Sequence, residues 1–508
     1  MIVWMLACAG EPKENGGWPI DTAPAGETAV DTAGSDDSDP TDSDTLDSEP
    51  GGSDSDSEPV DDTGEPAATS DLFTGGWSLY AASNRIDGEA DTHLGQRLAA
   101  GDFDGDGADA LLVAAPQDPI CGQGCGRIWR LEAPHLVDSL ADADLARSAN
   151  ASGHRLGGRL EVLDDLTGDG VPDIAVGAIH ANAGAGFGSS EMSGGVYLLD
   201  GTAAGTGDVT ASFATVAGDA TEMWVRASGS GDLDGDGSTD FAVGSHGGSG
   251  ASGEVNVFTS ALSGVTSVAD ASLTIRGNSD LARAGWSLDI GDVTGDGQDD
   301  LLIGGTEHVL DGGTKCGGAW LVHGPVAIST LDDADLDLQA DEDLEFAGLE
   351  IAITDDLDGD GGADLIVGSP QYGTAAEGAV YVIAGTTTGV GRLVDAGAIV
   401  TGNEGDRVGV SLASADFDQD GQADLVVGGD GNDFAGRDAG MAALLAGPLS
   451  GSVSVDDAVA TWWGENPDDQ AATHLVPGDF DGDGLWDLAV GADGSSSGAA
   501  YVLLGGAR

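Results

Sequence analysis

Basic residues are scarce in this 508-residue chain, which has 16 lysines and arginines against 90 aspartates and glutamates. Lys13 and Lys315 are the only lysines, and the formal net charge is -74 at pH 7. Nucleic acids and anionic lipid headgroups need basic partners. A surface this acidic therefore excludes both as electrostatic partners. We therefore expect no nucleic-acid partner, and we expect cations to bind.

Cysteines are also few, with Cys8, Cys121, Cys125 and Cys316 in the whole chain. Four cysteines cannot form a disulfide framework for a protein of this length. Cys121 and Cys125 flank the tripeptide GQG, a spacing that suits a disulfide closing a small loop. A metal site is the alternative, although no second cysteine or histidine pair stands nearby at ligand spacing.

Long apolar runs are absent, and without 18 consecutive apolar residues the mature chain is predicted not to span a membrane. The short apolar segment MIVWMLAC, residues 1–8, resembles the end of a bacterial lipoprotein signal, in which Cys8 would be lipidated. It lacks a basic start and is short for a signal, so a plain secretion signal or a misplaced start codon is the alternative. We expect an extracellular or cell-surface protein, anchored to a bacterial outer membrane through Cys8.

Residues 9–70 contain almost no large apolar side chains and consist mainly of Asp, Ser, Pro, Thr and Gly. Such a segment cannot bury enough surface to offset the entropy of ordering, and its like charges repel one another. The composition predicts a disordered acidic stalk between the signal segment and the rest of the chain. A solubilising tail would have the same composition.

An acidic motif recurs seven times in residues 71–508. Its last copy, GDFDGDGLWDLAVGA, begins at Gly478 and places aspartates at positions 1, 3, 5 and 9 counted from Asp479. Successive copies are 60 to 67 residues apart, and each is accompanied by short apolar runs bounded by glycine and aspartate. About four such strands per repeat predict an all-β fold, a seven-bladed β-propeller over residues 71–508.

The two ends of this region are incomplete in a complementary way. The last repeat stops after its third strand, at AAYVLLGGAR, whereas the first is preceded by an extra strand-like segment, GGWSLYAAS, Gly75–Ser83. We expect this N-terminal strand to complete the last blade and close the ring, which removes exposed sheet edges. We expect the protein to be a monomer.

Several carboxylates in one short loop repel one another, and a divalent cation removes that repulsion. Oxygen ligands at positions 1, 3, 5 and 9, with a backbone carbonyl at position 7, favour Ca²⁺ over Mg²⁺. The glycine at position 6 permits the sharp turn. The loop is not an EF-hand, because Val490 stands at position 12, where that motif needs glutamate, and a strand follows.

The predicted metal ligands are Asp102, Asp104 and Asp106; Asp165, Thr167, Asp169 and Asp173; Asp232, Asp234, Asp236 and Asp240; Asp292, Thr294, Asp296 and Asp300; Asp356, Asp358, Asp360 and Asp364; Asp416, Asp418, Asp420 and Asp424; and Asp479, Asp481, Asp483 and Asp487.

We expect these loops to bind up to seven calcium ions, with unequal affinities. Thr167 and Thr294 replace a charged ligand by a hydroxyl, which predicts weaker binding in the second and fourth loops. The first loop has Ala110 at position 9, with Asp109 displaced by one residue, and is expected to be the weakest. An isolated Asp/Gly loop would be explained equally well as a polar turn, but seven copies in register are not.

The repeats resemble the FG-GAP family. Segments such as LLVAAP, AVGA and IVGSP follow the acidic loops like that family's GAP half, and pairs such as Leu94–Gly95 and Val408–Gly409 stand in its FG position. Trp224–Val225 and Ala471–Ala472 depart from the FG pattern. FG-GAP repeats form the seven-bladed propeller of integrin α subunits and of secreted bacterial proteins, so the resemblance implies calcium binding and adhesion or protein recognition. It carries no ligand site across.

Three functions remain open at this point. A recognition or adhesion platform for a protein or glycan is favoured, and a passive surface module is a second. The third is a calcium-dependent polysaccharide-acting enzyme similar to a lyase, which would need a cluster of basic or histidine side chains, for example at the mouth of the central channel. The eight histidines are scattered, and the closest candidate, His154–Arg155, is better explained as an exposed loop. We expect no catalytic site, and we expect Trp462–Trp463 to pack between blades rather than bind sugar.

Overall fold

The computed structural model describes residues 74–137, 139–178, 194–218, 225–247, 252–279, 282–307, 316–340 and 345–506. All of them belong to one compact unit, Gly64–Arg508. Outside the described residues lie the predicted signal segment with Cys8, the whole predicted stalk, 9–70, and residues 71–73 of the predicted propeller domain.

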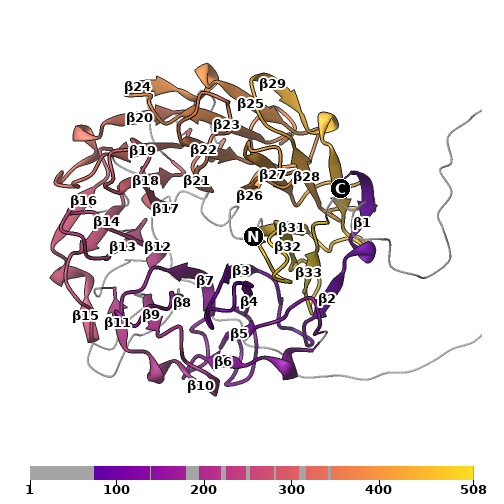
Figure 1. Cartoon of the computed structure of the whole chain (residues 1–508), viewed down its shortest axis with the longest axis horizontal. Coiled ribbons are helices and arrows are strands. Elements are labelled where there is room, and N and C mark those ends of the chain that lie inside the picture. The colour runs from indigo at the N-terminus through magenta and orange to yellow at the C-terminus, as the bar shows by residue number, and fades with distance from the viewer. Residues whose placement is uncertain are drawn as a thin grey trace, which may run out of the picture. The chain divides into compact units, whose positions relative to one another are not determined.

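Seven β-sheets succeed one another around a ring, each built mainly from one repeat (Figure 1). The innermost strand of each sheet lies towards the centre, and consecutive strands pair antiparallel towards the rim. The sequence prediction of a seven-bladed β-propeller is therefore confirmed. We number the blades by the order of the acidic loops.

The four main strands of the blades, from the centre outward, are as follows. Blade one contains β3 (Arg97–Gly101), β4 (Ala110–Ala115), β5 (Arg127–Leu131) and β6 (Leu145–Ser148). Blade two contains β7 (Leu156–Leu163), β8 (Asp173–Ala178), β9 (Gly195–Leu199) and β11 (Ala214–Ala217). Blade three contains β12 (Val225–Gly231), β13 (Asp240–Ser245), β14 (Glu254–Phe258) and β16 (Leu273–Arg276). Blade four contains β17 (Ala284–Gly291), β18 (Asp300–Gly305), β19 (Gly318–Val322) and β20 (Leu336–Gln339).

The remaining three blades follow the same order. Blade five contains β21 (Ile351–Thr354), β22 (Asp364–Ser369), β23 (Ala379–Ala384) and β25 (Ala398–Thr401). Blade six contains β26 (Val408–Ala415), β27 (Asp424–Gly429), β28 (Met441–Leu445) and β30 (Ala460–Trp463). Blade seven contains β31 (Ala471–Gly478), β32 (Asp487–Ala492), β33 (Ala499–Leu503) and β2 (Asn84–Asp87).

The second strand of every blade is buried along its whole length. In β8, β22 and β32, for example, each of the six residues is buried. A strand covered on both faces needs apolar residues at consecutive positions rather than at alternate ones. Runs such as DIAVGA and DLIVGS, which also use small residues, satisfy that requirement because a neighbouring blade packs against each face.

The N-terminal strand closes the ring, as predicted, but the closing strand is not the predicted one. β2 pairs antiparallel with β33, so that Ile86 lies opposite Ala500 in blade seven. Within the predicted segment Gly75–Ser83, β1 (Gly75–Ser78) instead pairs in parallel with β30 of blade six. A 3₁₀ turn, Leu79–Ala81 (η2), separates the two strands and buries Leu79. The chain thus runs first along the outer strand of blade six and then, after the 3₁₀ turn, along the outer edge of blade seven.

The same step recurs at other joints between blades. Four short strands, β10 (Gly205–Asp208), β15 (Gly264–Ser267), β24 (Gly389–Arg392) and β29 (Gly451–Ser454), each lie parallel to the outer strand of the preceding blade. Each is followed by a three-residue 3₁₀ turn and then by the fourth strand of its own blade. Backbone hydrogen bonds therefore tie neighbouring blades together at the rim.

Apolar side chains form layers between adjacent blades. One cluster combines Leu444 and the fully buried Trp462 of blade six with Leu488 and Tyr501 of blade seven. The expectation that Trp462 packs between blades is thus confirmed. Trp463 is half-buried, packs against the cluster between blades five and six, and stacks on Phe434. Among the described residues, the structure has no helix with the length and apolar character that crossing a membrane requires.

Candidate metal centre

Each acidic loop connects the first strand of a blade to the second, and its first aspartate holds the turn. In all seven loops an oxygen of this carboxylate accepts the N–H of the glycine at position 6. In the seventh loop this bond joins Asp479 Oδ2 to the amide of Gly484 at 2.8 Å. Gly484 has φ of +83°, a conformation that favours glycine. The glycine at position 6 is therefore required by the turn, as the sequence predicted.

The aspartates at positions 3 and 5 form similar local bonds. In the seventh loop, Asp481 Oδ1 accepts the N–H of Asp483 at 3.2 Å, and Asp483 Oδ1 accepts the N–H of Leu485 at 2.9 Å. One oxygen of each carboxylate thus holds the backbone, while the carboxylates are gathered on one side of the loop. Partial positive charge on the amides offsets only part of their mutual repulsion.

Five of the seven loops bring three carboxylates together, with one oxygen from each residue lying within 4.8 Å of the others. These groups are Asp102, Asp104 and Asp106; Asp232, Asp234 and Asp236; Asp356, Asp358 and Asp360; Asp416, Asp418 and Asp424; and Asp479, Asp481 and Asp483. All members except Asp424 are exposed or half-buried. Hard oxygen donors at this spacing suit Ca²⁺, which binds six to eight oxygens.

The second and fourth loops do not form such a group among the described residues. The hydroxyl of Thr167 lies 3.2 Å from Asp165 Oδ1, and that of Thr294 lies 3.4 Å from Asp292 Oδ1. Each hydroxyl therefore donates to a carboxylate of its own loop. Asp169 and Asp296 occupy position 5 in the same way as in the other loops. The lower calcium affinity of these two loops stays a prediction.

The ninth-position aspartates are buried and bind backbone amides. Asp487 has an exposed fraction of 0%; its Oδ2 accepts the N–H of Phe480 at 2.8 Å and its Oδ1 accepts the N–H of Gly505 at 2.6 Å. Equivalent bonds to the loop amides are made by Asp173, Asp240, Asp300, Asp364 and Asp424. Burial raises the pKa of Asp487 to about 7. It raises the pKa of Asp173, Asp240, Asp364 and Asp424 to about 6.

These residues therefore join the loop to the body of the blade. Of the six, only Asp424 is grouped with the carboxylates at positions 1 and 3. Asp364 retains a buried oxygen, Oδ1, that accepts no hydrogen bond from the described residues. In blades two, four, six and seven the equivalent oxygen accepts an N–H of the blade body, so Asp364 Oδ1 is not assigned to the loop. The three-carboxylate groups of the five loops are the arrangement that a divalent cation satisfies. The residues present thus fit calcium, and the ligand role of the ninth aspartates stays a prediction.

The first loop differs from the other six. Ala110 fills the ninth position and is fully buried. Asp109 does not replace the missing carboxylate, because its Oδ2 accepts the N–H of Asp479 at 2.9 Å, while Asp479 O accepts the N–H of Asp109 at 2.7 Å. This pair ties the first loop to the seventh. Asp299 makes a similar bond to the N–H of Asp232 at 2.7 Å. These bridges were not among the sequence predictions. The signal for them is an aspartate at position 8, which the first and fourth loops both carry.

The face of the propeller near His154 also differs from the expectation. His154 is buried, with an exposed fraction of 9%, and burial lowers the pKa of its imidazole. It lines a pocket together with Arg155, His93 and Asp91. Nearby, Cys121 and Cys125 form the predicted disulfide. The expectation of an exposed loop is thus wrong for His154. The loop closed by the disulfide is hydrogen-bonded to the residues on either side of it, since Gln123 O accepts the N–H of Gly153 at 3.0 Å and Gly124 O accepts that of Arg155 at 2.9 Å.

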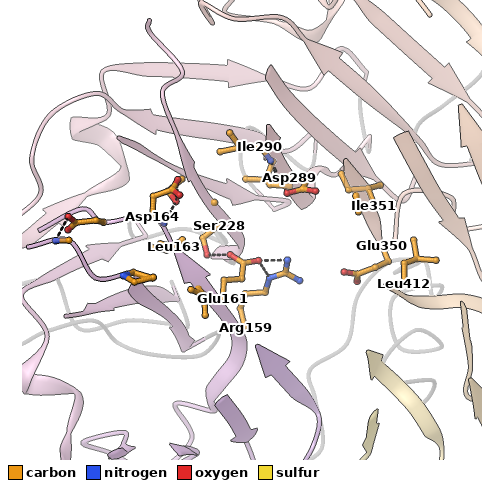
Figure 2. Close-up of a pocket in the computed structure, with 18 residues that line it drawn as sticks. Arg159, Glu161, Leu163, Asp164, Ser228, Asp289, Ile290, Glu350, Ile351 and Leu412 are labelled. Carbon is orange, nitrogen blue, oxygen red and sulfur yellow. Dashed lines mark hydrogen bonds and ion pairs between the residues drawn. The ribbon is translucent and has the colours of Figure 1, made fainter. Parts of the chain in front are cut away.

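The central channel combines basic and acidic side chains. Arg159 pairs with Glu161, and the Glu161 carboxylate also accepts a hydrogen bond from Ser228 of the next blade (Figure 2). Asp289 and Glu350 line the same cavity, which has a volume of about 640 Å³. Arg97 and His474 lie close enough to this group to influence its charges. The channel is therefore neither a uniformly acidic surface nor a purely basic cluster.

Comparison with known proteins identifies the repeats. Residues 356–427 match the model of the FG-GAP-like repeat, and residues 471–503 match that of the FG-GAP repeat. The chain is 29% identical over 244 residues to integrin alpha pat-2 of Caenorhabditis elegans and 34% identical over 172 residues to integrin alpha-E of Mus musculus. These matches cover 45% and 32% of this chain. Two segments of the propeller therefore match FG-GAP repeats, and part of the chain is similar to integrin α subunits.

A second group of relatives is enzymatic by name. The chain is 31% identical over 192 residues, 36% of its length, to phosphatidylinositol-glycan-specific phospholipase D of Homo sapiens. The matched part spans 23% of that protein, 19% of integrin alpha pat-2 and 14% of integrin alpha-E. The chain therefore spans less than a quarter of the length of these curated relatives.

Proposed function

Because the chain carries FG-GAP repeats folded as an integrin α-like propeller, we propose that it is a calcium-binding recognition or adhesion platform of the cell surface. The single observation that supports calcium is the grouping of three carboxylates in each of five loops. In the seventh loop, the carboxylates at positions 3 and 5 each hold the turn through one oxygen, and Asp479 at position 1 accepts loop amides with both oxygens. The loop therefore presents acceptors without needing to refold. Hard acceptors in this arrangement suit Ca²⁺.

The ion would stabilise the platform rather than contact its ligand. Carboxylates at positions 1, 3 and 5 would bind the ion, and the ninth aspartate would join the ion to the second strand of the blade. The bridges from Asp109 to the seventh loop and from Asp299 to the third loop connect neighbouring loops. Calcium in one loop would therefore restrain two blades.

Recognition is favoured over catalysis by the integrin relatives. The phospholipase match covers only 23% of that enzyme, so its activity does not transfer with the repeat. We propose a protein or glycan ligand, a monomeric platform, and attachment to a bacterial outer membrane through a lipid on Cys8. The segment that follows Cys8 would then tether the propeller to the membrane.

The test is capture of ligands by the purified protein in calcium and in chelator. A glycan array and a pulldown from labelled cell surfaces should give ligands that are lost in chelator. Both are read at about 5 mM calcium, a concentration above the dissociation constants of extracellular calcium modules. Mass spectrometry of the membrane fraction should show a lipid on Cys8. Absence of any calcium-dependent ligand would favour a passive module, and turnover of a captured glycan would favour an enzyme.

A further inference from the structure

Arg97 is a buried cation that lacks a partner. Its exposed fraction is 6%, and its Nε atom makes no hydrogen bond. Within the described residues its guanidinium forms no ion pair, in contrast to Arg159, which pairs with Glu161. Proteins rarely bury a charge without a partner, because desolvation then goes uncompensated. The site around Arg97 is therefore incomplete without a further group.

The strand register shows what surrounds Arg97. Arg97, Arg159 and His474 lie opposite the fifth residue of the second strand in blades one, two and seven. These blades are neighbours in the ring, and their inner strands β7, β3 and β31 lie side by side at the channel (Figure 1). The three side chains therefore form one arc. Burial lowers the pKa of His474 well below its usual range, and the two arginines add to this effect, so its imidazole is neutral.

An unpaired acid faces this arc from blade five. Glu350 occupies the equivalent level of its blade, where the Glu350 carbonyl accepts the N–H of Gly368 at 2.8 Å. Its half-buried side chain lines the channel cavity and forms no ion pair with a described residue. Glu350 still acts on Arg97 electrostatically, in the direction that favours the charged guanidinium. The two opposite charges thus face each other without being in contact.

The other acids near Arg97 are already engaged. Asp493, which also acts on Arg97 electrostatically, accepts a hydrogen bond from Gln96 at 2.7 Å. Glu161 pairs with Arg159 and accepts a hydrogen bond from Ser228. Asp289 accepts the N–H of Ile353 at 2.7 Å and that of Ile290 at 2.9 Å. Figure 2 shows Glu161 between Arg159 and Ser228 on one side of the cavity, with Glu350 projecting from the other side. Arg97 and Glu350 are the groups left to bind something else.

We propose that the channel binds a small zwitterion, a molecule with a carboxylate at one end and a protonated amine at the other. The carboxylate would accept hydrogen bonds from Arg97, whose planar guanidinium matches that group, and from His474. The amine would donate to Glu350. Glu350 and Arg159 line a cavity of about 640 Å³, which is in the size range of small-molecule sites, and Arg97 lies on the strand β3 next to the strand that carries Arg159. A ligand with both charges also suits a channel in which an isolated anion would meet Glu350, Glu161 and Asp289.

The test measures binding of ω-amino carboxylates to the full chain by titration calorimetry at constant calcium. Glycine, 4-aminobutanoate and 6-aminohexanoate vary the separation of the charges, and acetate and methylammonium carry one charge each. We expect one length to bind at least tenfold more tightly than either single-charge probe. Arg97→Gln and Glu350→Gln should each weaken that binding at least tenfold. Arg437→Gln, which alters an exposed arginine paired with Asp468, is the matched control and should change nothing.

Two outcomes overturn the proposal. One is the absence of saturable binding by every zwitterion, which would mean that water alone solvates the two charges. The other is binding of acetate as tight as that of the best zwitterion, or binding unaffected by Glu350→Gln, which would indicate a simple anion site. If Arg97→Gln does not fold, Glu350→Gln and the charge-conserving Arg97→Lys carry the test. The bound calcium is measured in parallel. Loss of zwitterion binding with unchanged calcium content would count against this proposal alone and not against the proposed calcium-binding platform.

Discussion

Removal of calcium should lower the melting temperature of the propeller by several degrees. An ion at ten times its dissociation constant stabilises the folded state by about 1.4 kcal/mol per site. The five carboxylate groups would therefore contribute about 7 kcal/mol. Unfolding entropy near 2.1 cal/mol/K per residue gives about 0.9 kcal/mol/K for the roughly 430 residues from 74 to 506. The expected shift is about 8 °C.

Scanning calorimetry in calcium and in chelator measures this shift, with magnesium as a control for nonspecific charge screening. The single-site variant Asp358→Asn should lose about one fifth of the calcium effect, because it removes one carboxylate from one of the five groups. It should melt no lower than the native protein in chelator, since it also relieves repulsion within its loop. Asp333→Asn, an exposed aspartate in a 3₁₀ turn, is the matched control.

The reasoning fails if the native protein melts at the same temperature in calcium and in chelator. It also fails if magnesium gives the same increase as calcium, because the loops would then be responding to ionic strength or to any divalent ion. An equal calcium effect in Asp358→Asn and in the native protein would show that the fifth loop binds no ion. Direct measurement of bound calcium by atomic absorption would then count the sites that remain.

Three further changes test the architecture, each read from urea-induced unfolding. Gly95→Ala should destabilise the protein far more than Gly451→Ala. Both glycines have positive φ, which costs an alanine about 1–2 kcal/mol. A Cβ at Gly95 would also lie 2.2 Å from the carbonyl oxygen of Ala499, whereas no atom lies within 4 Å of a Cβ at Gly451. Equal losses would argue against the close approach of blades seven and one. Ile86→Ala should cost about 2–5 kcal/mol if β2 completes blade seven, against under about 0.5 kcal/mol for the exposed Val390→Ala, and a small loss at Ile86 would count against ring closure. Asp487→Ala should cost about 2–6 kcal/mol in chelator as well as in calcium, because two buried amides lose their acceptor; a loss seen only in calcium would make Asp487 a ligand and not a clamp.

The blade number and the acidic loops were predictable because they rest on local chemistry. Each loop needs glycine at position 6 and aspartate at position 1, so the motif recurs visibly in the sequence. The departure at Ala471–Ala472 is similarly local: Ala472 adopts φ of +63°, in the region of the +85° of Gly95, so the fold is kept by a strained residue. Trp224 of the other departure lies outside the described residues.

The parts that could not be predicted depend on neighbours distant in sequence. The strand-like segment before the first repeat contains two strands in different blades, and only the pairing of β1 with β30 and of β2 with β33 separates them. A repeated short pattern, seen in GVTSVADASLTIR and GSVSVDDAVATWW, would have revealed the step, because each copy holds a serine that caps the 3₁₀ turn. The partnerless state of Arg97 is invisible in sequence, since seven blades must close before its surroundings exist.

The acidic surface and the channel follow opposite electrostatic rules. At the loops, exposed carboxylates repel one another in water, and a cation from solution would offset that repulsion. In the channel, burial makes each charge depend on a fixed partner, as in the Arg159–Glu161 pair. A chain with a net charge of -74 and only 16 basic residues nevertheless places the buried Arg97 and the half-buried Arg159 on inner strands beside the channel. Rigidity alone would be served as well by an apolar side chain at Arg97, so this unpaired arginine is better explained by binding than by stability.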